Sequence, residues 1–283
     1  MLDLALIKPI IQSALEEDIG RGDITGEATV SPSSYGRAKI IAEEKGILAG
    51  IEVAKEVFRL VSLGEVKFSH GLKDKAILTK GKSILILETD TLSILKGERV
   101  ALNFLSRLSG IATLTKKYVD LASPFGVKIF DTRKTTPNLR NLEKYAVRIG
   151  GGFNHRFALD SGILIKDNHI EICGGVKKAV ERARRKVSSF LKIEVEVGNL
   201  SEVKETIEAG VDAIMLDNMR IEETKEAVRL IRKEKRKILI EASGGVTLEN
   251  ITDIAKTGID LVSVGRLTHS IKSLSMSLQI IRK

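Results

Sequence analysis

Four short apolar runs in the second half of the chain decide the fold: 191-LKIEVEV-197, 213-AIMLD-217, 238-ILIEA-242 and 260-DLVSV-264. Each has the length and composition of a strand, and a stretch with helical spacing of apolar residues separates it from the next. Earlier runs at 127–131 and 162–166 extend the series toward the N-terminus. Because strands that alternate with helices pair in parallel, the pattern predicts a parallel α/β sheet.

The spacing of the strands indicates how the sheet is closed. Their ends at Glu196, Asp217, Glu241 and Gly265 lie 21, 24 and 24 positions apart, which is a regular length for a βα unit. A doubly wound open sheet would be expected to carry a glycine-rich dinucleotide fingerprint after an early strand, and the sequence has none. A closed or nearly closed barrel is therefore favoured over the open sheet.

The first half of the chain follows a different pattern. Residues 2–18 have helical spacing, and short strand-like runs follow, which together indicate an α+β region. The expected strands are 37–44, 66–69 and 83–88, and the expected helix between them is 50–63. From 94 to 122 apolar residues recur every three or four positions, so one or two helices, broken at Ser109-Gly110, would link the two regions near a domain boundary.

Composition restricts the function classes. The 283 residues are 43% hydrophobic, and 46 Lys and Arg against 37 Asp and Glu give a net charge of +9. That balance fits nucleic acid, an anionic membrane surface or small anionic substrates. Aromatics make up only 4%, with no Trp, and are not interleaved with basic residues, which argues against nucleic acid.

Cysteine content and the N-terminus bear on location. Cys173 is the only cysteine, so an intrachain disulfide is excluded and a reducing compartment is expected. The N-terminal apolar runs are too short for a membrane span and carry acidic residues that do not suit a secretory signal. We therefore expect a cytoplasmic protein with no membrane partner.

Cations and small residues gather in three segments beside strand-like runs. The segments are 131-DTRKTTP-137, 150-GGGFNHR-156 and 164-LIKDNH-169. Because the neighbouring strands would hold these side chains on a rigid scaffold, the arrangement predicts a site for polyanionic ligands. In a parallel barrel the carboxyl ends of the strands converge on one face, which is where catalytic residues sit.

Carboxylates also stand at the strand ends. In 193-IEVEV-197 the period of two puts Glu194 and Glu196 on the interior side, where cations, metal or ligand hydroxyls must compensate them. An internal salt bridge is the alternative explanation. Glu196 and Asp217 could hold Mg²⁺ that also contacts a diphosphate. The turns at 243-SGG-245 and 264-VGR-266 could receive a phosphate, although plain tight turns would look the same.

The chain resembles quinolinate phosphoribosyltransferase, and the resemblance runs nearly from end to end. It is carried by 131-DTRKT-135, 150-GGGFNHR-156, 164-LIKDNH-169, 194-EVE-196, 216-LDN-218, 241-EASGG-245 and 267-LTHS-270, together with 15-LEEDIGRGD-23 and 97-GERVALNFL-105. The family joins quinolinate to 5-phosphoribosyl 1-diphosphate with Mg²⁺ and releases diphosphate and carbon dioxide, which yields nicotinate mononucleotide for NAD biosynthesis.

The resemblance also implies roles for individual residues. Lys134, Lys166, Glu196 and Asp217 would be catalytic, with Glu196 and Asp217 also at the metal. The residues implied in substrate binding are Arg99, Thr132, Arg133, Lys134, His155, Arg156, Lys166, Glu196, Asp217, Glu241, Ser243, Gly244, Val264, Gly265 and His269. Arg133, Arg156 and Lys166 would hold the quinolinate carboxylates, and Arg99 would come from a neighbouring subunit, so a homodimer or larger assembly is implied.

The family's architecture is an N-terminal α/β sandwich domain followed by an incomplete parallel α/β barrel. Carried over to this chain, the sandwich would comprise 1–108 joined by a C-terminal helix at 270–283, and the barrel would comprise 109–269. Three other functions stay open: a related phosphoribosyltransferase that uses nicotinate, a molybdenum-associated relative, and a non-enzymatic nucleic-acid-binding protein that only the net charge supports.

Overall fold

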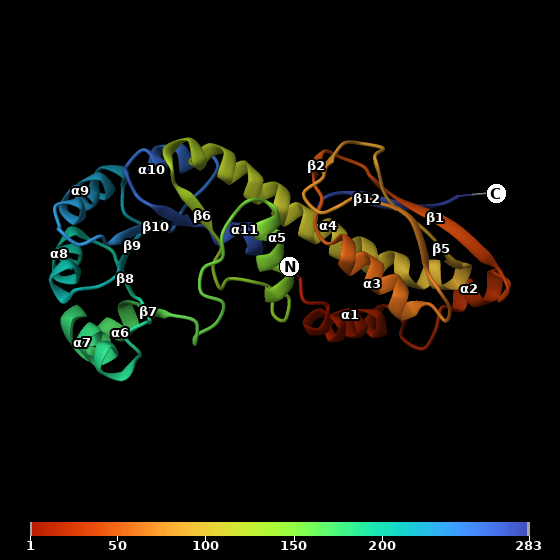
Figure 1. Ribbon diagram of the computed structural model, residues 1–283, viewed down its shortest axis with the longest axis horizontal. Helices are drawn as coiled ribbons and strands as arrows, with labels where there is room; N and C mark the ends of the chain where they lie inside the picture. Colours follow the sequence, from red (N-terminus) through yellow and green to blue (C-terminus); the bar gives the residue numbers. More distant parts are fainter. Residues whose placement is uncertain (1, 282–283) are drawn as a thin grey trace. The chain divides into compact units, whose positions relative to one another are not determined.

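The computed structural model describes residues 2–281, which form two compact units (Figure 1). Unit 1 comprises Met1–Lys116, Thr135–Gly151 and Arg266–Lys283, and unit 2 comprises Lys117–Lys134 and Gly152–Gly265. The division differs from the expected boundary at 108/109, because 135–151 also belongs to unit 1. Within the described residues, the helices are all too short or too polar to cross a bilayer.

Unit 1 is built on an antiparallel sheet with the strand order β12-β1-β5-β3. The bounds are β1 (Tyr35–Ala42), β3 (Lys67–Gly71), β5 (Ser83–Asp90) and β12 (Met276–Ile280), and a small second sheet pairs β2 (Gly46–Ile47) with β4 (Ile77–Leu78). Its helices are α1 (Leu4–Ile19), α2 (Ile24–Thr29), α3 (Ile51–Val61), α5 (Arg140–Ile149) and α11 (Arg266–His269).

The expected C-terminal helix at 270–283 is wrong, as far as the described residues reach. The segment forms strand β12, which pairs antiparallel with the edge of β1, Met276 opposite Ala42 and Ile280 opposite Ala38. Leu274, Met276, Leu278 and Ile280 recur every second residue, which is the period of a strand. The segment completes the N-terminal sheet as its edge strand.

The expected break at Ser109-Gly110 is also wrong. A single helix, α4 (Thr91–Ala122), runs through both residues from unit 1 into unit 2. A Cβ at Gly110 would overlap the carbonyl oxygen of Lys272. The glycine therefore permits a close approach of the 272–273 backbone, which a local helix-breaking signal cannot indicate.

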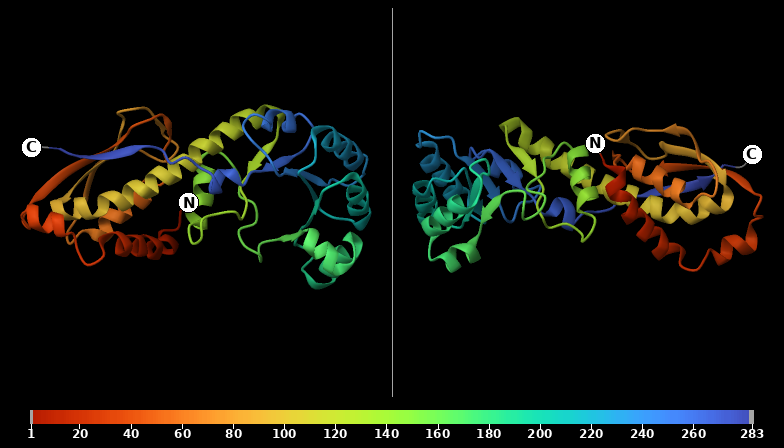
Figure 2. Two further views of the ribbon diagram at one scale, coloured as in Figure 1. Left: turned by 180° about the vertical axis from the view of Figure 1, so that it is seen from behind. Right: turned by 60° about the horizontal axis from the view of Figure 1, so that its bottom comes forward.

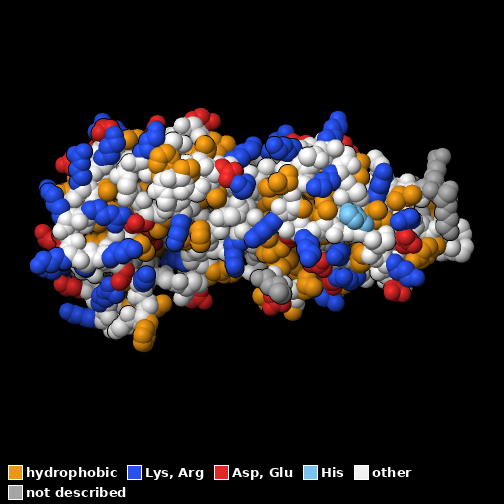
Figure 3. Space-filling view, turned by 45° about the horizontal axis from the view of Figure 1, so that its top comes forward, with side chains coloured by type: hydrophobic (Ala, Val, Ile, Leu, Met, Phe, Trp, Pro, Cys, Tyr) orange, Lys and Arg blue, Asp and Glu red, His pale blue; other side chains and the backbone are white. Residues whose placement is uncertain are grey.

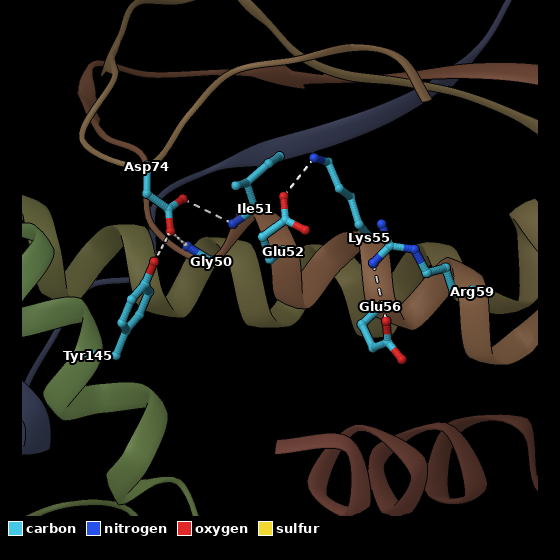
Figure 4. Close-up of polar contacts among 8 residues, drawn as sticks. All are labelled: Gly50, Ile51, Glu52, Lys55, Glu56, Arg59, Asp74 and Tyr145. Atoms are coloured by element: carbon cyan, nitrogen blue, oxygen red, sulfur yellow. Dashed lines mark hydrogen bonds and ion pairs between the residues drawn. The ribbon is translucent and has the colours of Figure 1, made fainter. Parts of the chain in front are cut away.

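An aspartate from outside the helix caps α3 (Figure 4). Gly50, at the N-cap, has a φ of 96° and no side chain to cap with. Asp74 supplies the carboxylate instead and accepts hydrogen bonds from the N–H groups of Gly50 and Ile51 at 3.1 and 3.0 Å. Tyr145 of α5 donates its hydroxyl hydrogen to the same carboxylate. One acid thus ties two helices of unit 1 together.

Unit 2 is built on a parallel sheet with the strand order β6-β11-β10-β9-β8-β7. The bounds are β6 (Lys128–Phe130), β7 (Ile163–Ile165), β8 (Ile193–Val197), β9 (Ala213–Asp217), β10 (Leu239–Ser243) and β11 (Leu261–Ser263). The strands follow chain order from β7 to β11, and β6 lies beside β11, so the sheet has the strand order of a barrel that is open between β6 and β7. The expected incomplete parallel barrel is confirmed.

Helices cover one face of this sheet. They are α6 (Asp167–Cys173), α7 (Val176–Lys186), α8 (Leu200–Ala209), α9 (Ile221–Arg232) and α10 (Ile251–Ala255), and a 3-10 turn at Ser123–Phe125 precedes β6. Figure 2 shows α7, α8 and α9 side by side on the outer side of the strands. The opposite face carries the polar side chains that form the candidate site.

Candidate active site at the strand ends

Strand β8 turns its two glutamates to the inner face of the sheet. Val195 and Val197 are buried, while Glu194 and Glu196 keep 14% and 16% of their side-chain exposure. The predicted orientation of both carboxylates therefore agrees with the alternating burial along the strand. Both are also in ion pairs, so the alternative of internal salt bridges is realised at the same positions.

Lys166 is the partner of Glu196. It follows β7 directly, and its Nζ donates a hydrogen bond to Glu196 Oε2. The Lys166 N–H donates to His169 Nδ1 at 3.1 Å, so His169 caps α6. The structure thus brings together two residues that the sequence placed 30 positions apart, and it gives His169 a local structural role.

His155 occupies a cluster with two glutamates. Its Nε2 lies 3.2 Å from Glu194 Oε2 and 3.3 Å from Glu241 Oε2. Its Nδ1 accepts a hydrogen bond from the Arg156 N–H at 2.9 Å. Both ring nitrogens are therefore engaged inside the protein.

This cluster could in principle hold a cation. The ligand atoms of His155, Glu194 and Glu241 all lie within 4.8 Å of one another. Because Nδ1 accepts an N–H, the ring hydrogen lies on Nε2, the nitrogen that would have to face a metal. The geometry therefore favours a cluster that holds a proton over a metal centre.

Burial and charge set the proton affinity of the cluster. Burial and the charge of Glu194 raise the pKa of Glu241 to about 7, against the opposing effect of His155. Burial lowers the pKa of His155, but hydrogen bonds to Glu194 and Glu241 and their charges outweigh it and raise that pKa. Because the groups are in contact, the raised affinity belongs to the cluster as a whole.

Two arginines lie close to each other in unit 2. Burial and then the positive charge of Arg133 lower the pKa of Arg156, while Glu194 raises it. Arg156 Nη1 donates to the carbonyl oxygen of Gly162 at 3.0 Å. Two guanidinium groups held near each other favour an anion between them, since an anion relieves their repulsion and each offers a fork of donors.

The loop after β6 carries the other predicted cation of this unit. Lys134 is exposed, and its N–H donates to Thr132 Oγ1 at 3.0 Å, which tightens the turn. Thr132, Arg133 and Lys134 follow Asp131, whose side chain is fully buried. The loop thus begins from a fixed point at the end of the strand.

Two turns stand at neighbouring strand ends. Strands β10 and β11 pair with Ala242 opposite Val262, so the turns through Ser243-Gly244 and Val264-Gly265 are adjacent. Gly244 has a φ of 83°, and a Cβ there would overlap Asn218 Oδ1. Asn218 in turn donates to Asp217 Oδ2 at 2.7 Å. The glycine is required by this close approach.

Two expected site residues belong to unit 1. Arg99 is exposed on α4, and His269 is exposed at the end of α11, where its Nδ1 lies 2.6 Å from Ser270 Oγ. The other expected site residues belong to unit 2. The sequence places Asp131 among the polar groups at the strand ends without a specific role, and in the structure it accepts hydrogen bonds from Asn154 and His155. Its position directly after a strand was the available signal.

Comparison with known proteins identifies relatives along almost the whole chain. Models of the N-terminal and C-terminal domains of quinolinate phosphoribosyl transferase match residues 23–109 and 111–279. A Bacillus subtilis protein named probable nicotinate-nucleotide pyrophosphorylase (carboxylating) is 43% identical over 274 residues, which cover 97% of this chain and 93% of the relative. A Nicotiana tabacum protein named quinolinate phosphoribosyltransferase (decarboxylating) 1b is 40% identical, and the match covers 97% of this chain and 82% of the relative.

Solved structures give the same result. The crystal structure of NadC from Streptococcus pyogenes has a TM-score of 0.93 and 43% identity, and covers 100% of this chain and 99% of that one. The nicotinate-nucleotide pyrophosphorylase from Francisella tularensis has a TM-score of 0.93 and 39% identity, and the match covers 99% of this chain and 98% of that one. Human nicotinic acid phosphoribosyltransferase, at 12% identity and a TM-score of 0.63, shares the fold alone.

Proposed function

The chain belongs to the quinolinate phosphoribosyl transferase family, and we propose that it transfers the phosphoribosyl group of 5-phosphoribosyl 1-diphosphate to quinolinate. The products are nicotinate mononucleotide, diphosphate and carbon dioxide. The relatives' two names, pyrophosphorylase (carboxylating) and phosphoribosyltransferase (decarboxylating), describe this one reaction from its two directions. The protein is a pentosyltransferase of NAD biosynthesis.

The observation that carries the substrate assignment is the pair Arg133 and Arg156, because the positive charge of Arg133 helps to lower the pKa of Arg156. Each arginine lowers the cost of placing an anion beside the other. Quinolinate has two adjacent carboxylates, so two guanidinium forks suit it better than they suit a monocarboxylate such as nicotinate. Lys134 and Lys166 would add positive charge at the same strand ends.

The second substrate, 5-phosphoribosyl 1-diphosphate, would lie along the carboxyl ends of the strands from β8 to β11. The adjacent turns at Ser243-Gly244 and Val264-Gly265 support a role in binding the 5′-phosphate, because turns of this kind offer backbone N–H groups to an anion. Glu196 and Asp217 end neighbouring strands, which suits contacts with the ribose hydroxyls. Glu241, buried behind them, would support this site through the His155 cluster.

Mg²⁺ is part of the proposal. Glu196 and Asp217 offer the carboxylate oxygens that Mg²⁺ prefers, on adjacent strands, so the residues fit the ion. When bound with diphosphate, Mg²⁺ would neutralise charge on the leaving group. Lys166 contacts Glu196 through Oε2, and the second carboxylate oxygen can accept from another ligand.

The chemistry follows from these charges. As diphosphate leaves, positive charge develops on the ribose, and the carboxylates of Glu196 and Asp217 are placed to stabilise it. The pyridine nitrogen then forms the new bond to carbon and becomes a cation. That cation stabilises the electron pair left on the adjacent carbon when carbon dioxide departs, so transfer precedes decarboxylation. The carbon takes up a proton to give the product.

Assembly and location are further parts of the proposal. Arg99 is exposed on α4, which suits a side chain that reaches a neighbouring subunit's site, so we expect a homodimer or a larger assembly. A single cysteine supports a cytoplasmic location. Figure 3 shows Lys and Arg interspersed with Asp and Glu on the visible face, and this gives nucleic-acid binding no contiguous basic surface there.

The test is release of labelled carbon dioxide from carboxyl-labelled quinolinate with 5-phosphoribosyl 1-diphosphate and Mg²⁺. The parent should turn over quinolinate and not nicotinate, and Lys166→Ala should lose most of the activity. Lys177→Ala, an exposed lysine at the start of α7, is the matched control. Turnover of nicotinate in place of quinolinate would favour the related transferase, and no turnover of either would favour a relative outside NAD metabolism.

A further inference from the structure

Asp131 fixes the segment that carries His155 and Arg156. Its side chain is fully buried, and its Oδ2 accepts from Asn154 Nδ2 at 2.5 Å while its Oδ1 accepts from the His155 N–H at 2.9 Å. The backbone of the same segment pairs with β6, because Asp131 N donates to Phe153 O at 3.1 Å and Phe153 N donates to Ile129 O at 2.8 Å. The carboxylate extends this pairing beyond the end of the strand.

The imidazole of His155 holds the backbone of the next residue, Arg156. Its Nδ1 accepts the Arg156 N–H, and its Nε2 faces Glu194 and Glu241. Side chains therefore hold the N–H groups of both His155 and Arg156. The backbone from which the Arg156 side chain leaves is fixed, and its guanidinium is held in turn by Gly162.

We propose that Asp131 and His155 are positioning residues that hold Arg156 beside Arg133 for the quinolinate carboxylates, and that the His155 ring does not itself contact substrate. The inference rests on the proposed function and replaces the expected direct role of His155. A buried carboxylate such as Asp131 would repel a substrate carboxylate, so its benefit must come through the groups that it orients.

The physical reason for such support is the repulsion between the two arginines. Left on a mobile backbone, Arg156 would move away from Arg133 toward water, and the ordering cost would fall on quinolinate binding. Fixing the backbone removes that cost before the substrate arrives. Misplacement of a binding group by about 1 Å can cost about a hundredfold in activity. Loss of this support should therefore raise the KM for quinolinate and leave the KM for 5-phosphoribosyl 1-diphosphate nearly unchanged.

The test exchanges the two partners across one hydrogen bond. Asn154→Asp puts two carboxylates in contact and should raise the KM for quinolinate about tenfold or more, while the KM for 5-phosphoribosyl 1-diphosphate changes less than about twofold. The double variant Asp131→Asn/Asn154→Asp restores an amide facing a carboxylate, and the new amide oxygen at position 131 can still accept the His155 N–H. It should recover the quinolinate KM to within about threefold of the parent.

The matched control is Asp260→Asn. Asp260 also accepts a backbone N–H, from Ile240 at 2.7 Å, but at the amino end of β11, away from the strand ends of the site. It should lower the melting temperature without changing either KM. If Asn154→Asp does not fold, Asp131→Asn alone is compared with Asp260→Asn at equal loss of melting temperature.

Three outcomes would overturn the inference. An unchanged quinolinate KM in a folded Asn154→Asp variant would show that the support is dispensable. Equal rises in both KM values would show a merely structural role. A double variant that regains the stability of the parent but not its KM for quinolinate would show the same. An inactive parent would overturn the proposed function instead, so the two failures are distinguishable.

Discussion

Arg107 and Glu143 form an ion pair that joins α4 to α5 in unit 1. Glu143 on α5 is fully buried, while the Arg107 side chain on α4 keeps 28% of its exposure. Arg107 Nε and Nη2 donate to Glu143 Oε1 at 2.9 and 2.6 Å. Arg107 Nη2 also donates to Thr136 Oγ1, and the Thr136 N–H donates to Glu143 Oε2 at 3.1 Å. The pair thus fixes the loop that leads into α5.

Arg107→Met should be among the more destabilising single changes in unit 1. The methionine fills similar space, but Glu143, in its buried position, loses both guanidinium hydrogen bonds while keeping the one from the Thr136 amide. Removing one partner of a buried pair costs about 3–5 kcal/mol. Because Arg107 is partly exposed, water can approach the carboxylate, so we expect about 3 kcal/mol, the lower end of that range.

Denaturant unfolding followed by circular dichroism measures the change, with calorimetry as the second method. The double variant Arg107→Met/Glu143→Leu should regain most of the loss, because an apolar pair leaves no uncompensated buried charge. Arg220→Met, which removes an exposed ion pair with Glu223, is the control and should change nothing measurable. If Arg107→Met is as mild as that control, Glu143 must be solvated and the reasoning fails.

Three further changes test other features. Gly244→Ala would bring a Cβ into contact with Asn218 at a φ of 83° and should lower the melting temperature and raise the KM for 5-phosphoribosyl 1-diphosphate; an unchanged KM would separate this turn from the phosphate. Glu241→Gln should flatten the pH dependence of stability. Since the pKa of Glu241, in contact with His155 and Glu194, rises from 4.5 to about 7, the stability that its proton contributes is present below pH 4.5 and lost as pH rises through 7, which denaturation at pH 4.5 and 8 would detect. Tyr145→Phe removes one hydrogen bond to Asp74 and should cost about 1 kcal/mol in denaturant unfolding, and no loss would mean that water replaces the hydroxyl.

Local patterns made unit 2 predictable. The alternation in 193-IEVEV-197 fixes which face each glutamate occupies, because a strand has a period of two. Regular spacing then identified the parallel repeat, since short connections force successive βα units into adjacent positions. These inferences need only neighbouring residues, and the structure agrees with them from β7 to β11, while β6 pairs with β11.

Features that depend on distant partners could not be read from the sequence. Strand β12 is a strand because β1 offers it an unpaired edge more than 230 positions earlier in the chain. Gly110 continues a helix because the 272–273 backbone approaches it. Asp131 accepts hydrogen bonds from Asn154 and His155, which lie 23 and 24 positions away. In each case the decisive contact follows from the tertiary fold.

The charged side chains on the inner face of unit 2 indicate how this site could bind two anionic substrates. Lys166 is in an ion pair with Glu196, and His155 Nε2 lies within hydrogen-bond distance of Glu194 and Glu241. Arg156 lies within the field of both the positive Arg133 and the negative Glu194, and an incoming dicarboxylate would relieve the repulsion between the two arginines. A ligand of Glu196 can bind its second oxygen, because Lys166 contacts only Oε2. A ligand that instead draws the carboxylate away from Lys166 would let the lysine meet a substrate carboxylate, and occupancy of Glu196 and binding of the dicarboxylate would then favour each other.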